Sequence, residues 1–101
     1  MKMATTVIKD FVVRNRHFTI VKDEDANYLA IEDKYITDGK INRTLNGFQM
    51  FASKDVNDCM KSCANQVEID YLIAQGNSKA VAFCTVFNIM DRLEAVEKMF
   101  A

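Results

Sequence analysis

Apolar residues recur at spacings of three and four between Ser53 and Gln75, the most clearly periodic stretch of the chain. This spacing places them on one face of a helix. The residues on this face are Val56, Cys59, Met60, Cys63, Val67 and Tyr71. Ser53 can act as an N-cap whose hydroxyl accepts hydrogen bonds from N–H groups of the first turn. Gly76 can adopt the left-handed conformation that ends a helix. We therefore predict a helix over residues 53–75.

A second helical pattern runs from Lys79 to Phe100. Its apolar side consists of Val81, Phe83, Cys84, Phe87, Met90, Leu93 and Phe100. Asn77 or Ser78 can cap its start, and residues 88–91 are where it could kink. The connection to the first helix is only about three residues long, which predicts a helical hairpin. Residues 80–87 are apolar nearly all round, so we expect this part to be the most buried.

The first half of the chain shows patterns of β-strands. Residues 5–13 are rich in β-branched side chains, and residues 17–22 and 28–36 alternate between apolar and polar positions. A polar segment, residues 23–27, predicts a turn between them. Asp38-Gly39 and Asn46-Gly47 predict two further hairpins, because both central positions of a type I′ turn need a positive φ. Residues 40–45 would lie between these turns, and residues 48–52 would follow the second. The 40–45 segment is the weak member, because only Ile41 and Leu45 in it are apolar, and it could be an edge strand or an extended loop.

Strands that precede helices favour the α+β class over an alternating α/β fold. We predict an antiparallel β-meander of four to five strands, followed by an α-helical hairpin packed on one face. Residues 1–101 are expected to form a single α+β domain. The predicted core consists of Phe18, Ile20, Leu29, Ile31, Val56, Cys63, Val67, Phe83, Phe87 and Met90.

The composition is typical of a soluble globular protein, with 50% apolar and 27% charged residues. No apolar run approaches the roughly 20 residues of a membrane span. The first ten residues, MKMATTVIKD, lack the uninterrupted apolar stretch of a signal peptide. We therefore expect a cytoplasmic protein without a membrane contact.

The three cysteines, Cys59, Cys63 and Cys84, are expected to be buried free thiols. A metal or catalytic site built from them and His17, the only histidine, is the alternative. A zinc site needs about four ligands in a tetrahedron, and the spacing of Cys59 and Cys63 differs from the C-x-x-C of redox pairs. The three glycines form no phosphate-binding loop, and no motif of a catalytic site occurs. We therefore predict no catalytic residue, no metal and no cofactor.

The net charge of −1 gives no general affinity for polyanions. A basic patch on the sheet, with tyrosines as stacking groups, could nevertheless bind a single-stranded nucleic acid. Its members would be Arg14, Arg16, Lys22, Arg43, Tyr28 and Tyr35. Acidic residues are interspersed on the same elements, which favours a solvated mixed face, so direct nucleic-acid binding is the alternative.

Two acidic groups are the candidate partner-binding residues: Asp23, Glu24 and Asp25 in the turn, and Asp91, Glu94 and Glu97 on the second helix. Three carboxylates in one short turn cannot be buried without partners at low cost. Surfaces of this kind suit a basic protein partner through electrostatic complementarity. Arg92 and Lys98 lie among the second group, so an ordinary solvated helix face is the alternative.

The segments NYLAIEDKYI, LNGFQMFASKDVNDC and QVEIDYLIAQGNSKA resemble those of small proteins carried by phages and integrative elements of low-GC Gram-positive bacteria. Some proteins of this kind are anti-CRISPR inhibitors. The resemblance implies a protein partner, a Cas nuclease, and inhibition by blocking its engagement of nucleic acid or guide RNA. It extends over residues 16–90 and transfers no individual functional residue. We therefore expect a small non-enzymatic protein-binding module, with a nucleic-acid-binding regulator as the alternative.

Overall fold

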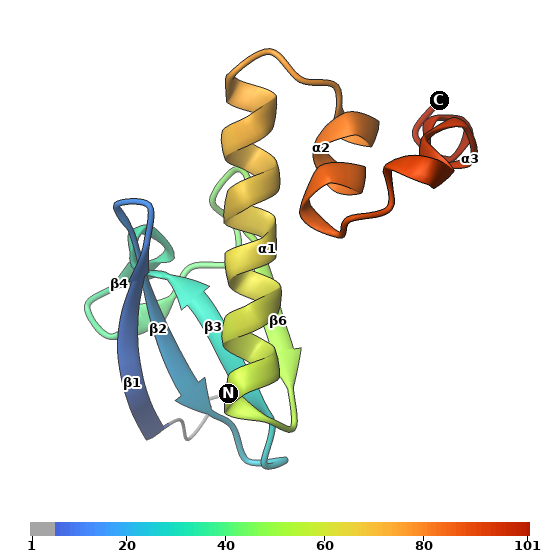
Figure 1. Ribbon diagram of the computed structural model, residues 1–101. Coiled ribbons are helices and arrows are strands. Elements are labelled where there is room, and N and C mark those ends of the chain that lie inside the picture. The colour runs from blue at the N-terminus through green and yellow to red at the C-terminus, as the bar shows by residue number, and fades with distance from the viewer. Residues whose placement is uncertain (1–5) are drawn as a thin grey trace. The chain divides into compact units, whose positions relative to one another are not determined.

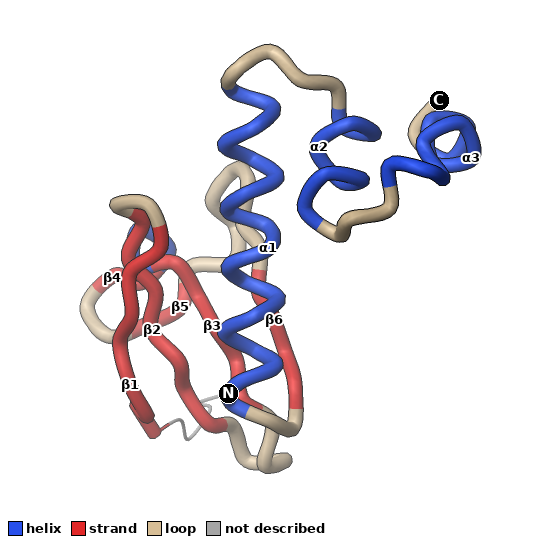
Figure 2. The backbone as a smooth tube through the Cα atoms, viewed as in Figure 1, coloured by secondary structure: helices blue, strands red, loops and turns tan. Residues whose placement is uncertain are grey.

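The computed structural model describes residues 6–101, in which strands precede helices and the α+β class is confirmed (Figures 1 and 2). The chain divides into two compact units, one ending at Cys63 and the other running from Ala64 to Ala101. Helix α1 (Val56–Ala74) begins in the first unit and ends in the second. The single domain over residues 1–101 stays a prediction.

A four-stranded antiparallel sheet dominates the first unit. Its strands are β1 (Thr6–Val13), β2 (Arg16–Lys22), β3 (Tyr28–Glu32) and β6 (Met50–Ser53), in the order β1-β2-β3-β6. Thr5, the first residue of the first predicted strand, lies outside the described residues. Arg14 and Asn15 both have positive φ, which gives the β1–β2 hairpin the backbone of a type I′ turn. A register shift next to Ile8 bulges β1 near its start.

The strand predicted over residues 28–36 is wrong beyond Glu32. The chain turns there into a 3₁₀ segment, η1 (Asp33–Tyr35), and then forms a small hairpin of β4 (Ile36–Thr37) and β5 (Lys40–Ile41). Asp38 and Gly39 have φ of 53° and 74°, which confirms the type I′ turn predicted for them.

The second predicted hairpin, at Asn46-Gly47, is wrong. Only Gly47 has a positive φ, and no strands pair on either side of this turn. The carbonyl of Gly47 instead accepts a hydrogen bond of 2.8 Å from the hydroxyl of Tyr35. β6 pairs directly with β3. The segment between these two strands folds over the sheet (Figure 2).

Residues that alternate along a strand point to opposite faces of the sheet. Both faces of β3 are covered. One face carries an apolar cluster of Val21, Leu29, Ile31 and Tyr35, with Ile36, Ile41, Phe48 and Met50 packed against it. On the other face the first turns of α1 approach the sheet, where Cys59 Sγ donates a hydrogen bond of 3.0 Å to the carbonyl of Phe51. The return of residues 33–50 over the first face was not predicted.

Both ends of α1 follow local rules. The predicted N-cap, Ser53, is wrong: it ends β6, and Asp55 caps the helix by accepting from the N–H groups of Asn57 and Asp58 at 2.7 and 3.2 Å. Gly76, at φ 104°, ends the helix as predicted. Its N–H and that of the following residue bond back to carbonyls of the last turn in a Schellman motif.

In the second unit, α2 (Lys79–Val86) follows the end of α1 in a hairpin-like arrangement. Of the two predicted caps of α2, Asn77 and Ser78, it is Ser78 that caps the helix, accepting a hydrogen bond from the N–H of Val81 at 3.1 Å. The continuous helix predicted to Phe100 is wrong, because Asn88 adopts a φ of 56° and ends α2. A 3₁₀ turn, η2 (Met90–Arg92), and α3 (Leu93–Met99) follow. The packing of these helices on the sheet stays a prediction.

The break at Asn88 gives the second unit a small core of its own. Ala80 and Cys84 of α2 and Val96 of α3 are buried, with Phe83, Ile89 and Leu93 packed against them. Six predicted core residues are confirmed as buried: Phe18, Ile20, Leu29, Ile31, Cys63 and Val67. Val56 and Phe83 are half-buried. The prediction that Phe87 and Met90 belong to the core is wrong, because they are 43% and 48% exposed.

Phe87→Ala is expected to lower the free energy of unfolding by only about 1 kcal/mol, below the roughly 3–5 kcal/mol of a packed core phenylalanine. The ring of Phe87 is half exposed and contacts chiefly Phe83, at a centroid distance of 4.7 Å. Urea denaturation of the two proteins measures the difference. A loss above about 3 kcal/mol would show that the ring is enclosed, contrary to the structure.

Candidate functional site

The acidic turn between β2 and β3 is built around one of its own carboxylates. Asp23 Oδ1 accepts hydrogen bonds of 2.9 Å from the N–H groups of Asp25 and Asn27. Its backbone N–H donates to the carbonyl of Asn27 at 3.0 Å. Asp23 is half-buried, whereas Glu24 and Asp25 are exposed. Glu24 and Asp25 are therefore the two carboxylate residues of this turn that lie exposed at the surface.

The second acidic group, Asp91, Glu94 and Glu97, is exposed at all three positions. Asp91 lies in η2, whereas Glu94 and Glu97 are one turn apart on α3. The turn and this group belong to different units. The structure therefore offers two acidic surfaces, one in each unit, and the assignment of both to partner binding stays a prediction.

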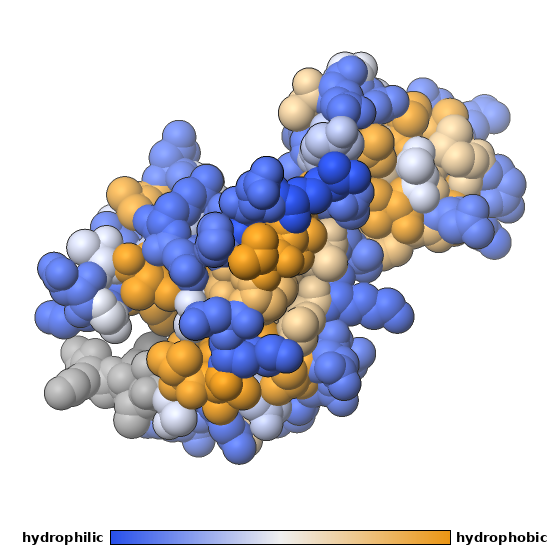
Figure 3. All heavy atoms as spheres, turned by 60° about the vertical axis from the view of Figure 1, so that its left-hand side comes forward, coloured by the Kyte–Doolittle hydropathy of each residue, from blue (hydrophilic) through white to orange (hydrophobic). Residues whose placement is uncertain are grey.

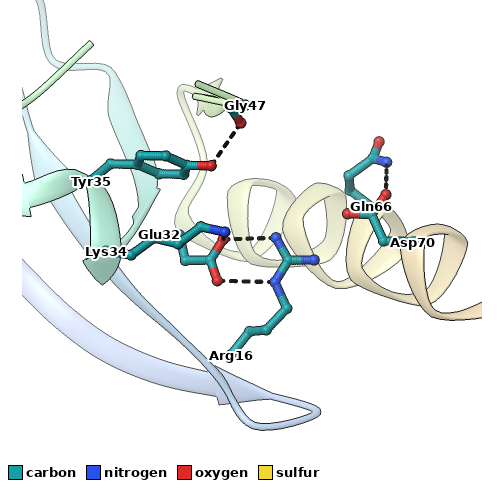
Figure 4. A network of polar contacts seen from close by, with 7 residues as sticks. All are labelled: Arg16, Glu32, Lys34, Tyr35, Gly47, Gln66 and Asp70. Carbon is teal, nitrogen blue, oxygen red and sulfur yellow. Dashed lines mark hydrogen bonds and ion pairs between the residues drawn. The ribbon is translucent and has the colours of Figure 1, made fainter. Parts of the chain in front are cut away.

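A bidentate ion pair occupies the helix-covered face of the sheet (Figure 4). Arg16 Nη2 and Nε donate to Glu32 Oε1 and Oε2 at 2.7 and 3.0 Å. The Glu32 side chain is 11% exposed, and Lys34 Nζ lies 3.8 Å from Oε1. The guanidinium also lies over the ring of Phe18 at 5.6 Å. The pair therefore supports the fold and is not presented as a recognition surface.

The arrangement of the basic residues does not favour nucleic-acid binding. Tyr35 is 6% exposed with its hydroxyl bonded to Gly47, so it cannot stack on a base as the protein is folded. Tyr28 is half-buried, and Lys22 Nζ lies over its ring at 5.6 Å. Arg16 is paired with Glu32. Neither an aromatic platform nor a set of unpaired cations is therefore formed by these residues.

All three cysteines are buried and free. Burial raises the pKa of the Cys59 thiol, and burial followed by the nearby Cys59 raises the pKa of Cys63 to about 12. His17 is exposed on β2, opposite Val12 in the register. Among residues 6–101 no three or more His, Cys, Asp or Glu side chains are grouped so that they could hold a metal ion. The thiols of Cys59 and Cys63 are thus held in their unreactive, protonated form.

The raised pKa of Cys63 predicts a loss of stability in alkali. The folded protein holds this thiol proton more tightly than the unfolded chain, whose value is near 9.0, so the contribution is complete below pH 9 and is lost as the pH approaches 12. The free energy of unfolding, measured by urea denaturation, should therefore fall more steeply above pH 9 in the wild type than in Cys63→Ala. Parallel slopes would contradict this prediction.

Large apolar side chains that reach the surface were missed by the sequence pattern. Hydrophobic residues appear in several surface groups bordered by hydrophilic ones (Figure 3). In the second unit the exposed ones are Tyr71, Phe87, Met90, Met99 and Phe100. The sequence signal that could have indicated the exposure of Phe87 and Met90 is Asn88, which lies between them. Asparagine is the residue other than glycine that most readily ends a helix in the left-handed conformation.

Comparison with known proteins finds no matching family model, no similar curated protein and no similar solved structure. Within residues 6–101, no helix is both long enough and apolar enough to cross a bilayer.

Proposed function

We propose that this protein is a small, non-enzymatic, cytoplasmic protein-binding module that inhibits a Cas nuclease by occupying its nucleic-acid or guide-RNA site. The observation that carries the proposal is the exposure of the acidic groups, Glu24 and Asp25 in one unit and Asp91, Glu94 and Glu97 in the other. The resemblance to anti-CRISPR proteins supports the class of partner. The net charge of −1 supports a protein rather than a nucleic acid as the partner.

The physical basis is electrostatic competition. A nuclease binds nucleic acid in channels lined by arginine and lysine, which are satisfied by phosphate oxygens. Exposed carboxylates present oxygen acceptors of the same charge and can form charge-assisted hydrogen bonds with those side chains. Complementary charges also accelerate association and make it depend on salt. An inhibitor of this kind needs no catalytic group.

The test is binding to purified Cas nucleases of low-GC Gram-positive bacteria, with and without guide RNA. Asp91→Asn/Glu94→Gln/Glu97→Gln and Glu24→Gln/Asp25→Asn should each slow association at low salt by about ten-fold or more, because steered association is that much faster than unsteered association. Asp23 stays unchanged in both variants, since its carboxylate forms the turn. Stopped-flow or biosensor kinetics measure the rate.

The control variant is Asp38→Asn/Asp58→Asn, which removes two exposed charges outside the proposed surfaces and matches the turn variant in charge. It should associate like the wild type. If both acidic-surface variants bind and inhibit unchanged, the acidic surfaces are not the site. If the wild type binds RNA directly with micromolar affinity at physiological salt, the nucleic-acid-binding alternative replaces the proposal.

A further inference from the structure

Asn46 and Gly47 form the corner of an exposed turn in the first unit. The N–H of Phe48 donates a hydrogen bond of 3.2 Å to the carbonyl of Leu45, so the turn is closed by the residues on either side of the pair. This hydrogen bond leaves out the peptide that joins Asn46 to Gly47. Both residues are exposed, and Gly47 adopts a φ of 80°. The turn therefore places an asparagine followed by glycine at the surface, outside the turn's own hydrogen bond.

An asparagine followed by glycine carries its own nucleophile. The main-chain nitrogen of Gly47 attacks Cγ of Asn46; the N–Cγ bond forms, the Cγ–Nδ2 bond breaks, and ammonia leaves with the proton of the Gly47 nitrogen. Water then opens the cyclic imide. Opening at Cγ gives aspartate, and opening at the main-chain carbonyl gives isoaspartate, whose main chain continues through Cβ and Cγ. Glycine favours the ring closure, because it has no Cβ to obstruct the approach and its backbone is the most free to rotate.

The other asparagines are hindered by their neighbours. Each of the remaining seven of the eight asparagines is followed by a residue with a side chain. Asn77 Nδ2 donates to the carbonyl of Leu72 at 2.9 Å, which holds its carboxamide in place. The nitrogen that follows Asn88 donates to the carbonyl of Cys84 at 2.8 Å, so it is engaged in a main-chain hydrogen bond. We therefore expect Asn46 to react first.

The carbonyl of Gly47 is held by a buried side chain. The hydroxyl of Tyr35 donates to it at 2.8 Å (Figure 4), and a Cβ on Gly47 would lie 3.2 Å from the same hydroxyl. Tyr35 is 6% exposed, and its ring meets that of Phe48 edge-on at 5.3 Å between centroids. Isoaspartate lengthens the main chain by one carbon just before Gly47, which displaces this carbonyl. The buried hydroxyl then loses its acceptor, and an unpaired buried donor destabilises a fold.

We propose that Asn46 is a site of spontaneous deamidation, restrained by the hydrogen bond from Tyr35 to Gly47, and that isoaspartate at this position loosens the apolar cluster of the first unit. Ring closure draws the Asn46–Gly47 peptide into a five-membered imide and so moves the Gly47 carbonyl. The hydrogen bond from Tyr35 opposes that movement. The inference does not depend on the proposed function, because no partner takes part in the reaction.

The test is incubation of the folded protein in mildly alkaline buffer, followed by tryptic digestion and mass spectrometry against a sample that was not incubated. The tryptic peptide of residues 44–54 contains Asn46 and no other asparagine. It should convert to the acid before any other asparagine peptide, and its product should be methylated by a protein isoaspartyl methyltransferase. Tyr35→Phe should convert about five-fold faster, because one hydrogen bond no longer opposes ring closure.

Tyr71→Phe is the matched control, since Tyr71 is a tyrosine of the other unit, and it should convert like the wild type. Asn46→Gln should stay unmodified, because glutamine has to close a less favourable six-membered ring. If Tyr35→Phe does not fold, the wild type in increasing urea gives the answer, since its rate should rise before the protein unfolds. Earlier conversion of another asparagine, equal rates in Tyr35→Phe and the wild type, or a rate that stays constant up to unfolding would overturn the inference.

A second experiment separates the longer main chain from the added charge. The isoaspartate form, isolated by chromatography, is one unit more negative than the unmodified chain with its net charge of −1. Asn46→Asp carries the same charge on an ordinary main chain. The isoaspartate form should unfold at a lower urea concentration than Asn46→Asp, which should match the wild type. Equal midpoints for the isoaspartate form and Asn46→Asp would mean that the apolar cluster is not loosened, and that part of the proposal would be wrong.

Discussion

Phe18→Ala is expected to lower the free energy of unfolding by about 3–5 kcal/mol. Phe18 lies on β2 and is 2% exposed, stacked on Phe11 at 5.4 Å between ring centroids. The guanidinium of Arg16 lies over its ring. Removal of the ring loses its transfer free energy and leaves a cavity under a charged group, which the surrounding residues can only partly fill. Urea denaturation followed by circular dichroism measures the loss.

Phe11→Ala is the control for this prediction. Phe11 stacks on the same ring from the edge strand β1 but is only half-buried, so its loss should cost about 1–2 kcal/mol. The double variant should be less destabilised than the two single effects together, because the rings contact each other. A loss below about 1 kcal/mol for Phe18→Ala would mean that the helix-covered face of the sheet is not a packed core.

Arg16→Met is the second substitution with a large expected effect, a loss of about 3 kcal/mol. It removes the bidentate partner of Glu32 and leaves a carboxylate whose side chain is 11% exposed. Lys34 is the weaker partner of Glu32, since its side chain is 62% exposed and its Nζ lies 3.8 Å from Oε1, beyond hydrogen-bond distance. The cost therefore comes chiefly from leaving a buried charge without its two hydrogen bonds.

The double variant Arg16→Met/Glu32→Met provides the test of this cause. It removes both charges and should recover much of the stability, because an apolar pair of similar size often replaces a buried ion pair at little cost. Lys40→Met, at an exposed position of β5, is the control and should change stability by less than about 0.5 kcal/mol. A double variant as unstable as Arg16→Met would show that the ion pair contributes through the packing of Arg16.

Neither Phe18 nor Arg16 belongs to the proposed acidic surfaces. Loss of partner binding in these variants should therefore follow the loss of folded protein. Binding measured at a temperature where the variant is fully folded should equal that of the wild type. The acidic-surface variants should show the reverse behaviour, with unchanged stability and slower association.

Local signals in the chain were sufficient for several parts of the structure. Gly76 ends α1, Ser78 caps α2 and Asp38-Gly39 forms its turn, each as expected. These features depend on the backbone preferences and hydrogen-bonding groups of one to four neighbouring residues. The acidic residues could also be expected at the surface, because unpaired carboxylates are costly to bury.

The wrong predictions came from sequence signals that are compatible with two different local structures. Asn46-Gly47 has the composition of a type I′ turn, yet the carbonyl of Gly47 binds the buried Tyr35 and Asn46 keeps a negative φ. Ser53 and Asp55 can both cap a helix, and pairing of β6 with β3 keeps Ser53 in the sheet. Phe87 fits a helical apolar face equally well whether that face is covered or open.

The sequence by itself determined the α+β class, the order of strands before helices, the acidic character of the exposed turn and the end of α1, because periodicity and capping act within a few residues. Only the tertiary structure decided that residues 33–50 fold over the sheet, that Glu32 is buried against Arg16, and that Phe87 and Phe100 stay at the surface. Each of these depends on which distant residue occupies the neighbouring space. A hydrophobic pattern specifies that a side chain prefers burial, but the partner that buries it is chosen by packing over the whole fold.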